Sequence, residues 1–126
     1  MVRKNLHCDA APAAIGPYSQ AVRAGNFVFL SGMLGIDPQT GSFAGATIAK
    51  QTHQILKNIA ALLASEGLTA DNVVKTTVFL KNLSEFNEVN TIYAELFGAN
   101  PPARSCVEVS RLPKDALVEI ECIAVD

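Results

Sequence analysis

Residues 73–80 read Val-Val-Lys-Thr-Thr-Val-Phe-Leu, a run of β-branched and aromatic residues that predicts a strand. The segments on both sides of this run have helical periodicity. Before it, Thr47 to Glu66 carries isoleucine and leucine at helical spacings, and Gly67 follows as a stop. After it, we expect a helix that begins at Ser84 as N-cap and ends near Phe97. The centre of the chain is therefore predicted to be helix–strand–helix.

Strand-like segments flank this central unit. Ser19 to Arg23 and Asn26 to Leu34 indicate a hairpin near the start of the chain. Ala103 to Val109 and Leu117 to Val125 indicate a second strand pair, separated by a turn that contains Pro113. The order β-β-α-β-α-β-β indicates an α+β fold, in which a mixed sheet carries two helices on one face. The other face of the sheet is then either solvated or covered by another subunit.

The chain of 126 residues and 13.4 kDa has the length of a single domain, which we expect to span residues 1–126. Hydrophobic residues make up 49% and charged residues only 17%, a composition that excludes intrinsic disorder. Because so few charges leave little polar surface, we expect apolar area to be buried against other copies of the chain. A net charge of −2 without a basic stripe does not favour nucleic acid as a partner.

The sequence has no segment typical of a membrane protein or a secreted precursor. No apolar run is long enough to span a bilayer, and Asp9 interrupts the place where a secretory signal needs its hydrophobic core. The three cysteines, Cys8, Cys106 and Cys122, are an odd number, and none forms a C-x-x-C pair. We therefore expect a cytoplasmic protein without disulfides. The two histidines lie far apart, so no metal site is predicted.

The two C-terminal strand segments carry the candidate chemistry. Strand alternation places Glu119 and Glu121 on one face, and it places Arg104 and Cys106 on one face of the preceding segment. If the two strands pair as a hairpin, their register brings Arg104 close to one of the glutamates. This arrangement fits a structural ion pair at a subunit boundary, or a guanidinium that binds a substrate carboxylate beside a proton-handling glutamate. We interpret Cys106 as an inert, small hydrophobic residue, because no base for a thiolate is identified.

Residues 102–115 read Pro-Ala-Arg-Ser-Cys-Val-Glu-Val-Ser-Arg-Leu-Pro-Lys-Asp, and residues 118–125 read Val-Glu-Ile-Glu-Cys-Ile-Ala-Val. Both stretches resemble the signature of the YjgF/RidA family. Further matches to this family lie at residues 11–21, Ser31-Gly32, 74–80 and 86–90. The resemblance implies a chorismate-mutase-like fold, assembled as a homotrimer with ligands bound in clefts between subunits. It also implies hydrolysis of reactive 2-imino and 2-enamino acids, such as 2-aminoacrylate and 2-iminobutanoate, to 2-oxoacids and ammonia, with no cofactor.

The same resemblance assigns roles to individual residues. Arg104 is similar to the family's carboxylate-binding arginine, and Glu119 falls where the family carries the glutamate that positions or activates water. The family's cleft positions are matched by Tyr18, Ser31, Gly32 and Asn90, with the backbone N–H of Cys106 completing the anion site. Glu121 is interpreted as a structural residue or as one that supports the site without contacting the substrate.

One segment departs from the family pattern. Many bacterial deaminases continue Ser-Gly with Gln-Ile-Pro, whereas Met33-Leu34-Gly35 stands here and resembles the eukaryotic-type branch more closely. The preferred side chain of the substrate is therefore left open. Two other functions remain as alternatives. The first is a trimer that binds 2-oxoacids or related carboxylates without turnover, and the second, less favoured by the acidic composition, is an endoribonuclease that inhibits translation.

Overall fold

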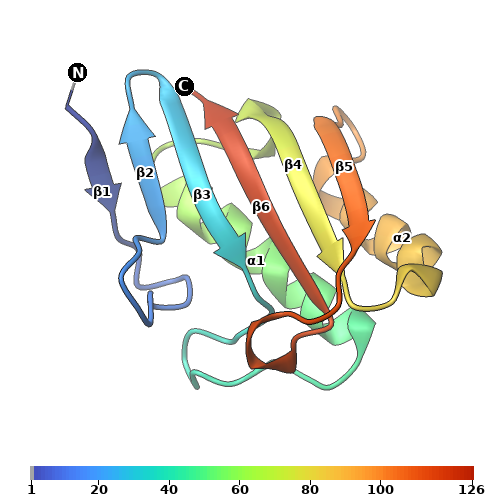
Figure 1. Cartoon of the computed structure of the whole chain (residues 1–126). Coiled ribbons are helices and arrows are strands. Elements are labelled where there is room, and N and C mark those ends of the chain that lie inside the picture. Colours follow the sequence, from blue (N-terminus) through green and yellow to red (C-terminus); the bar gives the residue numbers. More distant parts are fainter. Residues whose placement is uncertain (1) are drawn as a thin grey trace.

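The strands form one mixed sheet in the order β1-β2-β3-β6-β4-β5 (Figure 1), in a computed structural model that describes residues 2–126. All neighbouring strands are antiparallel except β4 and β5, which run parallel. The helices α1 and α2 both lie on one face of this sheet. In chain order the elements are β1 Lys4–Leu6, β2 Ala21–Ala24, β3 Phe27–Met33, α1 Ile48–Ser65, β4 Val73–Leu80, α2 Phe86–Phe97, β5 Ala103–Glu108 and β6 Val118–Val125. The predicted α+β fold is confirmed.

The predicted pairing of the last two strands is wrong. β6 lies between β3 and β4, and β5 pairs with the other edge of β4. The connection from β4 through α2 to β5 is a helical crossover, which joins parallel neighbours. β6 takes a central place because Val118, Ile120 and Ala124 are completely buried, and a central strand supplies that burial.

The helices agree with the sequence except at one cap. Thr47 caps α1 by accepting a hydrogen bond of 3.2 Å from the backbone N–H of Lys50, and Gly67 ends it with a φ of 73°. Ser84, the expected N-cap of the second helix, lies instead in a short 3₁₀ turn, Leu83–Glu85, and α2 begins after this turn. β1 was not predicted, because its three residues carry too short a pattern. Within residues 2–126, neither helix is both long and apolar enough to cross a membrane.

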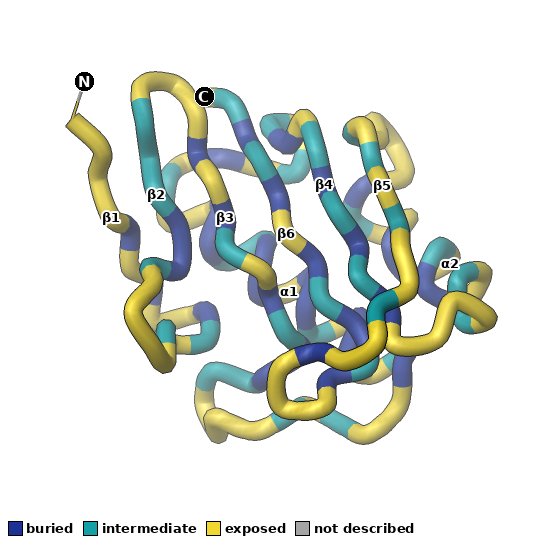
Figure 2. Tube along the Cα trace, in the orientation of Figure 1, coloured by how far each residue is buried: buried dark blue, intermediate teal, exposed yellow. Residues whose placement is uncertain are grey.

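The core lies between the sheet and the helices. Ile55, Ile59 and Leu62 of α1 are almost fully buried against it. Along β3 buried residues alternate mainly with exposed ones, and along β6 they alternate mainly with half-buried ones (Figure 2), as expected for strands with one covered face. On the face away from the helices, Phe27 and Phe29 remain 47% and 43% exposed. The chain therefore leaves a strip of apolar side chains on this open face of the sheet.

Candidate functional site

A cavity of about 540 Å³ lies where β3 ends and β6 begins. Four of the site residues expected from the sequence, Tyr18, Ser31, Gly32 and Glu119, line it. The remaining wall is mainly apolar and is made by Pro12, Ala13, Ile15, Met33, Leu34, Ile36, Pro38 and Pro113, together with Gln20, Gly41 and Lys114. The cavity thus joins one acidic group to a largely hydrophobic surface, which is the common character of small-molecule sites.

The carboxylate of Glu119 lies directly over the backbone of Gly32. A Cβ atom at Gly32 would come within 2.5 Å of Glu119 Oε2, so glycine is required for this approach. β3 departs from its regular register with β6 between Leu30 and Met33, and this irregularity includes the glycine. Burial raises the pKa of Glu119, and the charge of Glu121 raises it further. Glu119 therefore exchanges a proton more readily near neutral pH than an ordinary glutamate.

Gly32→Ala is expected to impair the site and leave the fold intact. The new methyl group displaces the flexible Glu119 side chain rather than backbone, so we expect the urea midpoint to stay close to that of the native protein. If Glu119 is catalytic, displacement of its carboxylate costs about 10- to 100-fold in kcat. The checks are steady-state kinetics and urea unfolding on the same preparation. A fully active Gly32→Ala protein would show that the position of Glu119 does not matter.

Ser31 and Tyr18 border the cavity in different ways. The hydroxyl of Ser31 donates a hydrogen bond of 2.6 Å to the carbonyl of Ser19 and is thereby fixed against the preceding segment. The side chain of Tyr18 is 52% exposed, and its hydroxyl accepts only a long hydrogen bond of 3.4 Å from the N–H of Ile15. Tyr18 is therefore free to meet a ligand at the mouth of the cavity.

A buried glutamine, which the sequence analysis did not single out, holds one wall of the cavity. Gln20 Oε1 accepts a hydrogen bond of 2.7 Å from the N–H of Cys8. Its Nε2 donates to the carbonyls of Cys8, Ala11 and Pro12 at 3.0, 3.2 and 2.7 Å. The side chain of Gln20 thus supplies the hydrogen bonds that a neighbouring strand would otherwise give to the backbone of segment 8–12. Its only sequence signal is a polar residue directly before the first β-rich run.

Two further buried amides fix the other walls. Gln51 Oε1 accepts a hydrogen bond of 2.9 Å from the N–H of Leu117, just before β6. Asn58 Nδ2 donates to the carbonyls of Leu34 and Ile36 at 3.2 and 2.9 Å. Both amides lie on the apolar side of α1, seven positions apart in the printed sequence. That spacing places them on one helix face, so the sequence did contain a signal for them.

Gln20→Met is expected to destabilise the protein strongly. Methionine keeps the length of the side chain but leaves three carbonyls, two of them buried and one partly buried, and one N–H without their partner. We expect the free energy of unfolding to fall by about 2–3 kcal/mol, measured by urea denaturation. Gln39→Met, on an exposed loop, is the matched control and should change it by less than about 0.5 kcal/mol. Equal stabilities of the two variants would contradict this role of Gln20.

Arg104 lies in a second cluster, on the face of the sheet that carries the helices. Its guanidinium carbon is 4.8 Å from the ring centre of Tyr93 and 5.4 Å from that of Phe86, both on α2. Across residues 2–126, no carboxylate comes within ion-pair distance of Arg104. The interpretation of Arg104 as half of a structural ion pair with Glu119 or Glu121 is therefore wrong within one chain.

Two other expected site residues accompany Arg104. Asn90 lies on α2 one turn after Phe86, and its Oδ1 is buried with no hydrogen-bond partner in the described part of the chain. Cys106 follows Arg104 on the same face of β5. Burial raises the pKa of the Cys106 thiol, which the charge of Arg104 only partly offsets. A raised pKa keeps the thiol protonated, in agreement with an inert side chain.

The two clusters lie on opposite faces of the sheet. Glu119 is the register partner of Phe79 on β4, whereas Arg104 is the partner of Thr76. Because Thr76 and Phe79 are three residues apart on one strand, they point to opposite sides. The expected proximity of Arg104 and Glu119 within one chain is therefore wrong. Tyr18, Ser31, Gly32 and Glu119 form one group, and Asn90, Arg104 and Cys106 form another.

Comparisons with known proteins agree with this architecture. Residues 8–126 match the family model described as Endoribonuclease L-PSP. A RutC family protein of Pyrococcus horikoshii is 50% identical over 123 residues, covering 98% of this chain and 98% of the relative. The chloroplastic Reactive Intermediate Deaminase A of Arabidopsis thaliana is 52% identical over 116 residues, covering 92% of this chain and 62% of the relative.

A solved structure extends the likeness to three dimensions. The crystal structure of E. coli TdcF with bound serine superimposes with a TM-score of 0.93 at 41% identity, and the match covers 98% of each chain. A member with this fold therefore binds a small amino acid. From the matched family model and these relatives, we conclude that the chain belongs to the YjgF/RidA family.

Proposed function

We propose that the protein hydrolyses reactive 2-imino and 2-enamino acids, such as 2-iminobutanoate and 2-aminoacrylate, to 2-oxoacids and ammonia. The observation that carries this proposal is the half-buried carboxylate of Glu119, whose raised pKa suits proton transfer, in a cavity that a small molecule can enter. The family includes a protein named as a reactive intermediate deaminase, and this chain is 52% identical to it over their matched residues.

The chemistry needs few groups. A protonated imine is already electrophilic at C2, so an oriented water molecule can attack it. In the proposed reaction Glu119 accepts the proton of this water as the C–O bond forms. Glu119 then returns this proton to the amino group of the adduct. The C–N bond breaks as the C–OH group becomes the carbonyl of the 2-oxoacid, ammonia departs, and the hydroxyl proton is released to solvent. Arg104 binds the substrate carboxylate through the two parallel N–H bonds that a guanidinium offers and an ammonium does not.

The two clusters can serve one substrate if they come from different copies of the chain. We propose a homotrimer in which Arg104, Asn90 and the backbone N–H of Cys106 of one copy face Glu119 of the next. The exposed phenylalanines on the open face of the sheet support self-association, since apolar strips of this kind are typical of contacts between subunits. Each cleft would then combine a carboxylate-binding half with a proton-transfer half.

The departure from the family's sequence pattern at residues 33–35 affects the apolar wall of the cavity rather than its polar end. Met33 and Leu34 line the cavity, and we propose that they contact the side chain of the substrate. Gly35 does not line it. A Cβ atom at Gly35 would lie 2.5 Å from the carbonyl oxygen of Gln51, so only glycine fits between this segment and α1.

The test is the release of ammonia or 2-oxoacid from 2-iminobutanoate and 2-aminoacrylate generated in solution. We expect the protein to accelerate release over the uncatalysed rate. A folded protein that gives no acceleration would refute the deaminase function. If that protein still binds 2-oxobutanoate, the function of a carboxylate-binding regulator takes its place, which the serine bound to TdcF makes the strongest alternative.

Two other expectations from the sequence remain predictions. The description of the family model names an endoribonuclease, but the net charge of −2 does not favour binding to a phosphate backbone. We therefore propose the deaminase rather than the nuclease. The cysteines Cys8, Cys106 and Cys122 are free, which is compatible with the proposed cytoplasmic location.

The pH dependence of the reaction should report Glu119. If its carboxylate accepts a proton, kcat/KM falls as the pH falls through its pKa, and this decline is centred above the ordinary range of a glutamate. Glu121→Gln removes the neighbouring charge that raises this pKa, so the decline should move to lower pH. The measurement is kcat/KM against pH for both proteins, after subtraction of the uncatalysed rate. Identical pH profiles for the two proteins would show that the decline in kcat/KM does not come from Glu119.

A further inference from the structure

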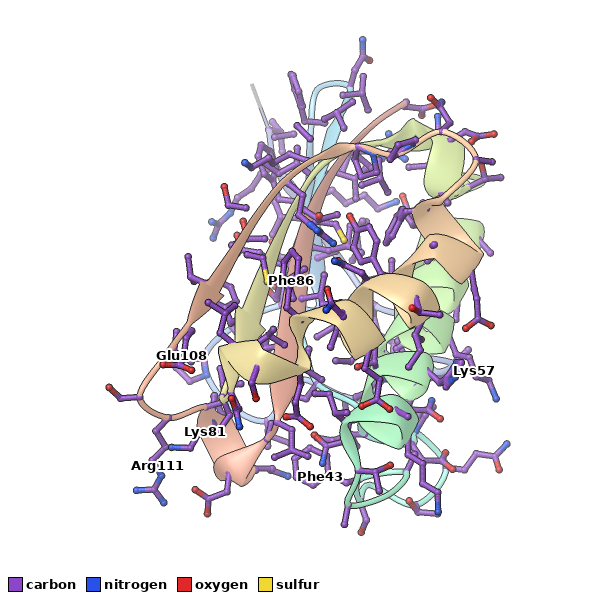
Figure 3. The ribbon with its side chains drawn as sticks, turned by 90° about the vertical axis from the view of Figure 1, so that its right-hand side faces the viewer. Phe43, Lys57, Lys81, Phe86, Glu108 and Arg111 are labelled. Carbon is purple, nitrogen blue, oxygen red and sulfur yellow. The ribbon has the colours of Figure 1, made fainter. Side chains whose placement is uncertain are left out.

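The guanidinium of Arg104 rests on aromatic rings rather than on a carboxylate. Phe86 and Tyr93 lie seven positions apart on α2, which places their rings on one side of the helix. Figure 3 shows Phe86 on the side of α2 that faces the strands. The guanidinium carbon of Arg104 is within 5.4 Å of both ring centres. These distances are typical of cation–π contacts.

This kind of contact suits an arginine that must still bind a ligand. A carboxylate partner would occupy the N–H groups along the edge of the guanidinium, whereas an aromatic ring contacts only its flat face. Arg104 has no carboxylate within ion-pair distance in residues 2–126. The charge is therefore held in place while its in-plane donors stay available for a bidentate contact.

The rings are themselves fixed. The hydroxyl of Tyr93 shares a hydrogen bond of 2.7 Å with the hydroxyl of Thr76, and Thr76 is completely buried. Thr76 is also the register partner of Arg104, so one strand pair anchors both the ring and the cation. On the helix, the ring of Phe97 lies 4.7 Å from that of Tyr93. The aromatic support of Arg104 thus has little freedom to move.

We propose that Phe86 and Tyr93 are positioning residues, which hold the guanidinium of Arg104 in the orientation that receives the substrate carboxylate. This inference rests on the proposed function of Arg104 as the carboxylate-binding residue. It predicts a loss of substrate affinity without a loss of the chemical step when a ring is removed, because Glu119 and its cavity lie on the other face of the sheet.

The experiment compares variants of Phe86, the more accessible of the two rings. Phe86→Leu keeps apolar volume but removes the ring, and we expect KM for 2-iminobutanoate to rise about three- to tenfold with kcat nearly unchanged. The dissociation constant for 2-oxobutanoate, measured by calorimetry, should rise by the same factor. Phe86→Tyr keeps the ring and should restore both constants.

Leu96→Ala is the matched control, because Leu96, like Phe86, is a partly buried residue of α2 that packs against the core, but it offers no ring to Arg104. It should lower the unfolding temperature at least as much as Phe86→Leu does and leave KM close to the native value. If Leu96→Ala raises KM as much as Phe86→Leu, the ring acts only through packing, and the inference is overturned. Native KM in Phe86→Leu would also overturn it. If the native protein binds 2-oxobutanoate but shows no turnover, only the deaminase function is refuted. The inference is then decided by the dissociation constants for 2-oxobutanoate of the native protein and the Phe86 variants.

Discussion

Glu119→Gln is expected to lower kcat for 2-iminobutanoate by about 10²- to 10⁴-fold, the usual contribution of a general acid–base group. Glutamine fills the same space over Gly32 but cannot accept the proton of an attacking water. Because the proposed carboxylate-binding residue lies in the other cluster, 2-oxobutanoate should bind the variant and the native protein with similar affinity. Steady-state kinetics measure kcat, and calorimetry measures the dissociation constant for 2-oxobutanoate.

The stability of the same variant provides its control. The pKa of Glu119 is raised in the folded protein, so folding favours its protonated form. The stability that this preference contributes is present at low pH and is lost as the pH rises through the folded-state pKa. Above that pKa the ionised carboxylate costs stability, so Glu119→Gln should raise the free energy of unfolding there. Native turnover in this variant would remove Glu119 from the mechanism.

Arg104→Ala is expected to lower kcat/KM by about 10²- to 10³-fold, since two charge-assisted hydrogen bonds of about 1.5–2 kcal/mol each are lost. The loss should appear mainly in KM and in the dissociation constant for 2-oxobutanoate. Arg104→Lys should recover only part of it, because an ammonium cannot make the bidentate contact. Kinetics of the three proteins with 2-iminobutanoate measure these differences.

The fold should tolerate the loss of Arg104. The guanidinium has no ion-pair partner in residues 2–126, so Arg104→Ala removes only its contacts with the rings of α2. We expect the free energy of unfolding to fall by about 1–2 kcal/mol in urea denaturation. If Arg104→Ala binds 2-oxobutanoate as tightly as the native protein does, Arg104 is not the carboxylate-binding residue.

Local signals predicted the elements but not their order in the sheet. The apolar periodicity of α1 and the β-branched run of β4 gave bounds within one or two residues of those observed. The hairpin around Pro113 failed because a turn signal fixes only a local change of direction. The place of β6 in the sheet depends on residues from distant parts of the chain, which bury its helix-facing side. A single sequence does not contain that information in any short segment.

The same holds for the candidate site, where the local patterns were predicted and the arrangement in space was not. Alternation correctly paired Glu119 with Glu121, and Arg104 with Cys106, on one face of their own strands. It could not give the face of the sheet to which each pair points, because that depends on the neighbouring strand. The amide of Gln20 escaped notice for a related reason. Its partners are backbone groups 8 to 12 positions away, and backbone partners leave no trace in residue type.

The proposed function requires that Arg104 of one copy and Glu119 of another act on the same substrate. Coexpression of Arg104→Ala and Glu119→Gln chains under different tags tests it, because each chain alone lacks one half of the site. In a mixed trimer, one of the three clefts combines the two intact halves, so purified mixed assemblies should regain about one third of native imine hydrolysis. Mixed assemblies that stay as inactive as the single variants would contradict the claim.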